Sequence, residues 1–271
     1  MYKLIALDID GTLLNDGKEI TPKTRDALIQ AQIKGSRVIL ASGRPIAGLV
    51  GFAKELEMDK YGGLLLGYNG AKVVKMTTNE TLVEFSIPNE IVVEFLRKLE
   101  RFDVVPFIDD GKRMYVKDSD GFQVKYEYTT NSLEPLLVEN IARALELDKL
   151  NPAKVLIAAP PEVLSPIIAD ITSGYEEQFS FILSAPFYLE MTMKGVNKAD
   201  ALKQTCEQLN ISKEEVIAFG DAQNDCTMIE YAGKGVAMAN SCEELLKLAD
   251  ETTLSNNDDG IAYSLMKNGV I

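Results

Sequence analysis

Short, unbroken apolar runs that end in polar residues constrain the fold of this chain more than any other feature. The runs LIAL (residues 4–7), VIL (38–40) and LLL (64–66) end near Asp8, Ser42 and Asn69. A run of this length without polar alternation is typical of a strand buried on both faces, as in a parallel sheet. Helical patterns separate the runs, as over residues 22–34, so the sequence predicts a doubly wound α/β sheet.

The pattern changes after about residue 72 and returns near Asn197. Residues 73–74 with 82–85, and 104–108 with 114–116, read as hairpins, while residues 91–99 carry a helical apolar spacing. Two further strands are predicted at 155–157 and 181–183, with a helix between them. Residues 198–209, 216–219 and 225–231 then read as helix, strand and helix. We therefore predict a discontinuous α/β core, residues 1–82 and 188–271, interrupted by an α+β domain at 83–187.

Composition excludes several classes of protein. The net charge of −13 disfavours non-specific binding to nucleic acid or to an anionic membrane surface, because both depend on Lys and Arg. The chain has no histidine, which rules out Ser-His-Asp triads and HExxH zinc sites. The three cysteines form no CxxC pair, and the first residues do not resemble a secretory leader, so we expect a cytoplasmic protein. No apolar run is long enough to span a membrane, so we expect no membrane segment.

The first acidic motif is DIDGT, residues 8–12, directly after the first predicted strand. Ligands of open α/β sheets bind beyond the carboxyl ends of the strands. Asp8 and Asp10 are expected to project similarly there, and two close carboxylates attract a divalent cation or share a proton. Gly11 permits a tight turn, and Thr12 offers a hydroxyl and an N–H for an oxyanion. An ordinary Asp-Gly turn is the alternative for the same residues.

A second acidic motif, GDAQND, follows the strand predicted at 216–219. Asp221 ends that strand, and Asn224 and Asp225 either cap or open the next helix. If the strands before Asp8 and Asp221 are neighbours, three carboxylates converge into an oxygen-ligand site suited to Mg²⁺.

Basic and hydroxyl residues stand at two other element ends. Ser42 and Gly43 follow the second strand, where the hydroxyl and neighbouring N–H groups could bind phosphoryl oxygens, although a lone serine is more often a helix cap. Arg44 is either a surface cation or a substrate contact. Lys198 opens a predicted helix and is a candidate point charge for phosphate.

Taken in order, DIDGT, the strand-end serine, the lysine and GDAQND resemble the haloacid dehalogenase superfamily of aspartate-nucleophile phosphatases. The insertion between the serine and the lysine resembles the Cof-type members, which have a large α/β cap. Two segments, SAPFYLEMTMKGVNK at 184–198 and MIEYAGKGVAMAN at 228–240, look like the YidA-type sugar phosphatases of that group. The resemblance covers essentially the whole chain.

The resemblance implies a Mg²⁺-dependent phosphatase for small phosphorylated metabolites, sugar phosphates first, acting as a monomer or homodimer. Asp8 would attack phosphorus and Asp10 would act as acid and base. Mg²⁺ would be held by Asp8, the Asp10 main-chain carbonyl and Asp221. The phosphate would contact Thr12, Ser42, Gly43, Arg44, Lys198 and Asn224, with Asp225 orienting its neighbours. The inserted domain would select the substrate; Arg44, Asn69 and Glu190 are candidates for that contact.

Two alternatives stay open at this point. A phosphoglucomutase-like enzyme would keep Asp8, Asp10 and Mg²⁺ but return the phosphoryl group to its sugar. A non-catalytic sugar-phosphate sensor would keep the fold alone, although crowding carboxylates around an anion brings no advantage to binding.

Overall fold

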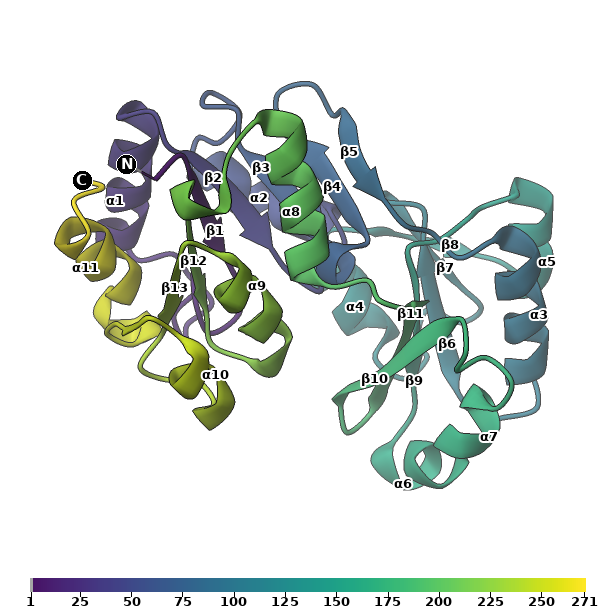
Figure 1. The fold of residues 1–271 in the computed structure, drawn as a ribbon. Coiled ribbons are helices and arrows are strands. Elements are labelled where there is room, and N and C mark those ends of the chain that lie inside the picture. The colour runs from purple at the N-terminus through teal and green to yellow at the C-terminus, as the bar shows by residue number, and fades with distance from the viewer. Residues whose placement is uncertain (1) are drawn as a thin grey trace. The chain divides into compact units, whose positions relative to one another are not determined.

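The computed structural model describes residues 2–271, which form two compact units (Figure 1). Within the described residues, unit 1 comprises residues 2–84 and 197–271, and unit 2 comprises residues 85–196. The predicted boundary after residue 187 falls instead after Val196, because the strand Tyr188–Met193 pairs with strands Phe179–Ala185 and Lys154–Ala158 of unit 2. No helix within residues 2–271 is long and apolar enough to cross a membrane.

Unit 1 is built on an eight-stranded sheet of order β14-β13-β12-β1-β2-β3-β4-β5. The strands from β14 to β3 run parallel, and β4 and β5 add an antiparallel edge. This is the predicted doubly wound α/β core. The strands are β1 Leu4–Leu7, β2 Arg37–Ala41, β3 Leu64–Gly67, β4 Lys72–Lys75, β5 Thr81–Glu84, β12 Val216–Gly220, β13 Lys234–Ala237 and β14 Glu251–Thr252.

Helices cover both faces of this sheet, which is why β1, β3 and β12 are buried along their whole length. Helices α1, α2 and α11 pack with Ile5, Leu7 and Phe219 into one core, while α8 and α9 contact strands β3, β4, β5, β12 and β13. The helices are α1 Pro22–Ile33, α2 Ala47–Glu55, α8 Lys198–Leu209, α9 Cys226–Tyr231, α10 Glu243–Leu248 and α11 Gly260–Lys267.

Unit 2 has its own six-stranded sheet of order β10-β11-β9-β6-β7-β8. Its pairs are antiparallel except β7 with β8, and both predicted hairpins, β4–β5 in unit 1 and β6–β7 here, are present. The strands are β6 Val105–Asp109, β7 Arg113–Val116, β8 Glu134–Leu137, β9 Lys154–Ala158, β10 Phe179–Ala185 and β11 Tyr188–Met193. The helices are α3 Asn89–Leu99, α4 Val124–Thr130, α5 Ile141–Asp148, α6 Pro161–Leu164 and α7 Ile168–Thr172.

A separate apolar core holds unit 2 together. Helices α3 and α5 pack on one face of the sheet, where Phe95, Leu145, Ile157 and Met191 are buried. Each unit therefore buries its own core, as two separately folded domains do.

Candidate active site

Three adjacent parallel strands of unit 1 bring the predicted site residues together. Strand β1 lies between β12 and β2, with Leu7 opposite both Phe219 and Leu40. The strands end together, so Asp8, Ser42 and Asp221 leave the sheet at one edge. The condition set by the sequence, that the strands before Asp8 and Asp221 be neighbours, is met.

Lys198 bridges two buried carboxylates at this edge. Its Nζ lies 2.6 Å from Oδ1 of Asp8 and 2.6 Å from Oδ1 of Asp225. The lysine is fully buried, and Asp8 is 6% exposed. Helix α8 begins at Lys198 because Asn197 caps it, its side chain accepting a hydrogen bond from the N–H of Asp200 at 2.9 Å. The helix start thus aims a buried ammonium at Asp8.

The electrostatics of this cluster reflect burial first and the closeness of the carboxyl groups second. Burial, and then the nearby charge of Asp225, raise the pKa of Asp8 to about 8, although Lys198 opposes the shift. Burial alone would lower the pKa of Lys198, but Asp225 and Asp8 outweigh it and raise that pKa. Lys198 therefore stays an ammonium, and one positive charge faces two carboxyl groups.

The second oxygen of Asp225 holds the loop after β12. Its Oδ2 accepts hydrogen bonds from the N–H groups of Asp221, at 3.1 Å, and Ala222, at 3.0 Å. Gly220 lies so close that an added Cβ would sit 2.5 Å from the Cβ of Asp225. Both oxygens of Asp225 are thus engaged by protein groups, which suits a residue that orients its neighbours.

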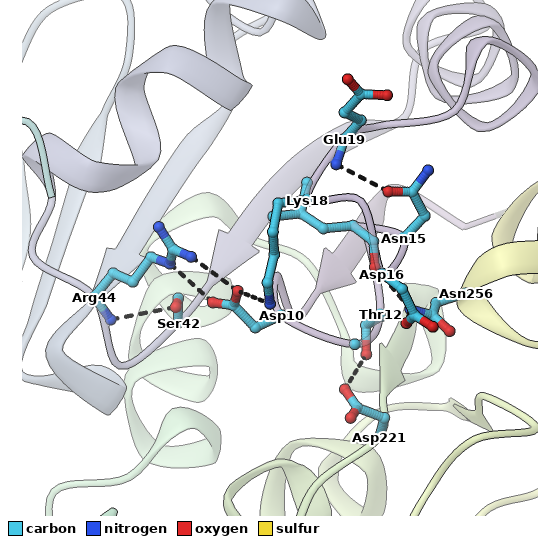
Figure 2. Close-up of polar contacts among 12 residues, drawn as sticks. Asp10, Thr12, Asn15, Asp16, Lys18, Glu19, Ser42, Arg44, Asp221 and Asn256 are labelled. Carbon is cyan, nitrogen blue, oxygen red and sulfur yellow. Dashed lines mark hydrogen bonds and ion pairs between the residues drawn. The ribbon is translucent and has the colours of Figure 1, made fainter. Parts of the chain in front are cut away.

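Asp221 lies against the DIDGT turn. Its Oδ1 accepts a hydrogen bond from the Thr12 hydroxyl at 2.6 Å (Figure 2). Burial raises the pKa of Asp221 to about 6, despite the hydrogen bond from Thr12. Gly11, at φ +88°, leaves room for this approach. The hydroxyl of Thr12 is therefore occupied by Asp221.

The donor set fits a divalent cation with oxygen ligands. Carboxylate oxygens of Asp8, Asp221 and Asp225 lie within 4.8 Å of one another. Asp225 is fully engaged, but Asp8 and Asp221 each keep Oδ2 outside the hydrogen bonds just described. Hard oxygen donors and surplus negative charge are what Mg²⁺ requires. The Asp10 side chain is not part of this group, so only its main-chain carbonyl is left as a candidate ligand.

The Asp10 carboxylate is held by two cations (Figure 2). Nε and Nη2 of Arg44 donate to Oδ2 and Oδ1, each at 2.8 Å, and Nζ of Lys18 lies 3.2 Å from Oδ1. Burial raises the pKa of Asp10, but the hydrogen bonds and charges of Arg44 and Lys18 prevail, so the pKa falls below its ordinary value. Arg44 is thus no isolated surface cation.

Sequence reasoning missed Lys18 and the side chains that anchor its loop. Asn256 Nδ2 donates to the Leu14 carbonyl at 2.9 Å and to Asp16 Oδ1 at 3.3 Å, and Asn257 bonds to Asp16 as well. Asn240 Nδ2 donates to the Gly11 carbonyl at 2.8 Å. These asparagines come from the far end of the chain, and no local signal links them to residues 11–18.

A second group of predicted residues is linked through Asn69, whose side chain lies against Gly43 and bonds to Asn224. Ser42 directly precedes Gly43. Ser42 is 4% exposed and accepts a hydrogen bond from the Arg44 N–H at 3.2 Å. It does not cap α2, whose N-cap is Ile46. Asn224 is exposed and donates from Nδ2 to Oδ1 of Asn69 at 3.1 Å. Asn224 lies inside the 3₁₀ turn Gln223–Asp225, whose N-cap is Ala222, and the N-cap of α9 is Asp225. Neither Ser42 nor Asn224 is therefore a helix cap.

Glu190 belongs to unit 2. It lies on β11, 9% exposed, with Oε1 3.2 Å from Nζ of Lys154 on β9. The pair joins two strands of the unit 2 sheet. Glu190 is thus the one predicted contact in unit 2, and the other site residues described above belong to unit 1.

Comparison with known proteins agrees with this geometry. A model of the haloacid dehalogenase-like hydrolases matches residues 5–265. A Bacillus subtilis protein named "Putative phosphatase YxeH" is 38% identical over 98% of this chain and 97% of its own. The 5-amino-6-(5-phospho-D-ribitylamino)uracil phosphatase YitU of the same species is 30% identical over 97% and 96%.

Solved structures show the same relationship. A haloacid dehalogenase-like hydrolase from Bacteroides thetaiotaomicron superposes with a TM-score of 0.94 at 35% identity, covering 99% of this chain and all of its own. A match over the whole chain, in sequence and in fold, confirms the family expected from the motifs. The protein belongs to the haloacid dehalogenase-like hydrolases, and among them it is a phosphatase of phosphoric monoesters.

Proposed function

We propose that the protein hydrolyses small phosphate monoesters, sugar phosphates foremost, through an aspartyl-phosphate formed on Asp8. One observation supports this above all others. Asp8 directly follows β1, and its Oδ1 is held by the buried ammonium of Lys198, while no hydrogen bond within the described residues, 2–271, reaches its Oδ2. A carboxylate fixed by one oxygen, with the other available, is suited to in-line attack on phosphorus.

The neighbouring groups have complementary roles in this proposal. Lys198 stabilises negative charge beside Asp8, and Ser42 with its neighbouring N–H groups binds phosphoryl oxygens. Asp10 gives a proton to the leaving alkoxide and later takes one from water. Because Arg44 and Lys18 favour the charged form of Asp10, an incoming phosphate that draws Arg44 away also makes Asp10 easier to protonate.

Asp8, Asp221 and the Asp10 carbonyl would hold Mg²⁺. When bound, the ion neutralises phosphoryl charge and orients the ester. Unit 2 would serve as the cap that selects the substrate and excludes water, as the resemblance implies. The small phosphorylated substrate named for the YitU relative is consistent with a metabolite of this kind.

The decisive experiment is hydrolysis of p-nitrophenyl phosphate, followed by a panel of sugar phosphates and other phosphometabolites ranked by kcat/KM. Activity should need Mg²⁺, disappear on addition of EDTA and return with excess Mg²⁺. Asp8→Asn should abolish turnover, while Asp26→Asn, at an exposed residue paired with Arg25, should retain it. Isomer formation without phosphate release would indicate a mutase, and ligand binding without turnover would indicate a sensor.

A further inference from the structure

The turn that follows β3 has an unusual backbone. Tyr68, Asn69 and Gly70 have φ values of 52°, 54° and 109°. Three consecutive residues are therefore left-handed, and a bulky aromatic residue such as Tyr68 adopts that region rarely and at a cost in folding free energy. Such a conformation persists only where the surroundings hold it, and strained residues of this kind cluster at functional sites.

The backbone of this turn holds the loop that carries Ser42. The Tyr68 N–H donates to the Arg44 carbonyl at 3.0 Å, and the Asn69 N–H donates to the Ser42 carbonyl at 2.9 Å. The Asn69 side chain lies over Gly43, where an added Cβ would sit 3.0 Å from its Nδ2. The position of Ser42 and its neighbours thus depends on the turn.

The same turn contacts the loops of Lys198 and Asn224. An added Cβ on Gly70 would lie 2.2 Å from the Asn197 carbonyl oxygen and 3.2 Å from the Lys198 nitrogen. On its other side, Oδ1 of Asn69 accepts the hydrogen bond from Asn224 at 3.1 Å. One strained turn therefore touches the loops that carry Ser42, Lys198 and Asn224, three residues that the resemblance implies as phosphate contacts.

We infer that Asn69 is a positioning residue for the phosphate subsite, acting through Asn224. The inference rests on the proposed function. Asn224 is exposed and sits in a short 3₁₀ turn, Gln223–Asp225, so little besides the Asn69 amide orients its side chain. The left-handed backbone at residue 69 lets one residue bond to the Ser42 carbonyl and to Asn224 together. Asparagine suits the position because it tolerates this conformation and carries an amide.

Asn69→Gly tests the side chain without straining the backbone, since glycine adopts positive φ freely. The melting temperature should stay within a few degrees of wild type. kcat/KM for p-nitrophenyl phosphate should fall roughly tenfold, with a matching rise in the inhibition constant of inorganic phosphate. Asn79→Gly is the matched control, because Asn79 is an exposed asparagine at φ 55° in the β4–β5 turn. It should change neither quantity.

A double-mutant cycle with Asn224→Ala separates positioning from a merely structural role. If Asn69 acts through Asn224, the double variant should be about as active as the weaker single variant. The inference would be overturned if the losses of kcat/KM multiplied in the double variant, or if either single variant kept wild-type activity. It would also be overturned if the loss in Asn69→Gly came with a large fall in melting temperature. A wild-type protein without Mg²⁺-dependent hydrolysis would instead refute the proposed function, and the Asp8→Asn assay distinguishes the two failures.

Discussion

At the scale of single residues, the site depends on a glycine, Gly11, as much as on its charged side chains. A Cβ added to Gly11 would lie 2.4 Å from Oδ2 of Asp221, the oxygen left free for a cation. The backbone there has φ +88°, which only glycine adopts without strain. Gly11 thus meets two requirements at once, a turn and a close approach of Asp221.

Gly11→Ala should therefore lower kcat/KM by on the order of a hundredfold, or about 2.7 kcal/mol of transition-state stabilisation. Steady-state kinetics across a range of Mg²⁺ concentrations would measure this. Gly35→Ala is the control, since Gly35 has φ +105° but no atom within 4 Å of an added Cβ. It should cost about 1–2 kcal/mol of stability and leave kcat/KM unchanged. Equal activities in the two variants would contradict the argument.

Lys198 links the chemistry of the site to the stability of the fold. Its ammonium is fully buried between Asp8 and Asp225, so removing it leaves two buried carboxyl groups without a counter-charge. Breaking a buried pair by removing one partner typically costs about 3–5 kcal/mol.

Lys198→Met should lower the free energy of unfolding by about that amount at pH 7, as measured by urea denaturation, and should abolish turnover. Lys203→Met, on the exposed face of the same helix, should stay within about 0.5 kcal/mol of wild type. A Lys198→Met protein as stable as wild type would show that the fold accommodates the two buried carboxyl groups without the ammonium.

At the scale of elements, an acid on β14 ties the edge of the sheet to α11. Oε1 of Glu251 accepts a hydrogen bond from the Ser264 hydroxyl at 2.9 Å, and Oε2 accepts one from Asn268 at 3.1 Å. Burial would raise the pKa of Glu251, but these hydrogen bonds and the charges of Lys267 and Lys234 outweigh it and lower the pKa. The folded state therefore favours the ionised side chain.

This contribution to stability should be complete above the ordinary glutamate pKa of 4.5 and be lost as the pH falls through the lower folded value. Urea denaturation between pH 6 and pH 3 should show a shallower loss of stability in Glu251→Gln than in wild type. Glu243→Gln, whose side chain is 91% exposed, should run parallel to wild type. Parallel curves for all three proteins would contradict a role for Glu251.

Elements with a strong local pattern could be predicted from the sequence. Helix α8 has its predicted bounds, Lys198–Leu209, because Asn197 caps it and its apolar residues recur at helical spacing. Strands β1 and β12 are uniformly buried, as their apolar runs indicate. The single helix expected between β9 and β10 is broken into α6, a 3₁₀ turn at Ser165–Ile167 and α7, with Pro166 at the break.

Features that depend on residues far apart in the sequence could not be predicted from local patterns. Strand β14 has only two residues and exists through its pairing with β13. The approach of Asn256 to the Asp16 loop and the left-handed backbone at Tyr68 have no counterpart in local spacing. The sequence therefore predicts the acids of the two motifs together with Arg44 and Lys198. Lys18 and the side chains that support the site are brought there by tertiary contacts.

At the scale of the whole molecule, the chain folds into two units with separate cores, and the inserted unit is continuous in sequence while the other is not. Leu28 on α1 and Leu145 on α5 are both fully buried, one in each core. Proteins with more than one domain commonly depart from two-state unfolding. Each leucine should thus report on the stability of its own unit.

Leu28→Ala and Leu145→Ala should each cost about 2–5 kcal/mol, because each removes buried methyl groups and leaves a cavity. In differential scanning calorimetry we expect two components, with Leu28→Ala lowering the melting temperature of one and Leu145→Ala that of the other. The ratio of calorimetric to van't Hoff enthalpy should exceed one in wild type. If both substitutions shift a single transition equally, the two units unfold as one cooperative body and the division of the chain is only geometric.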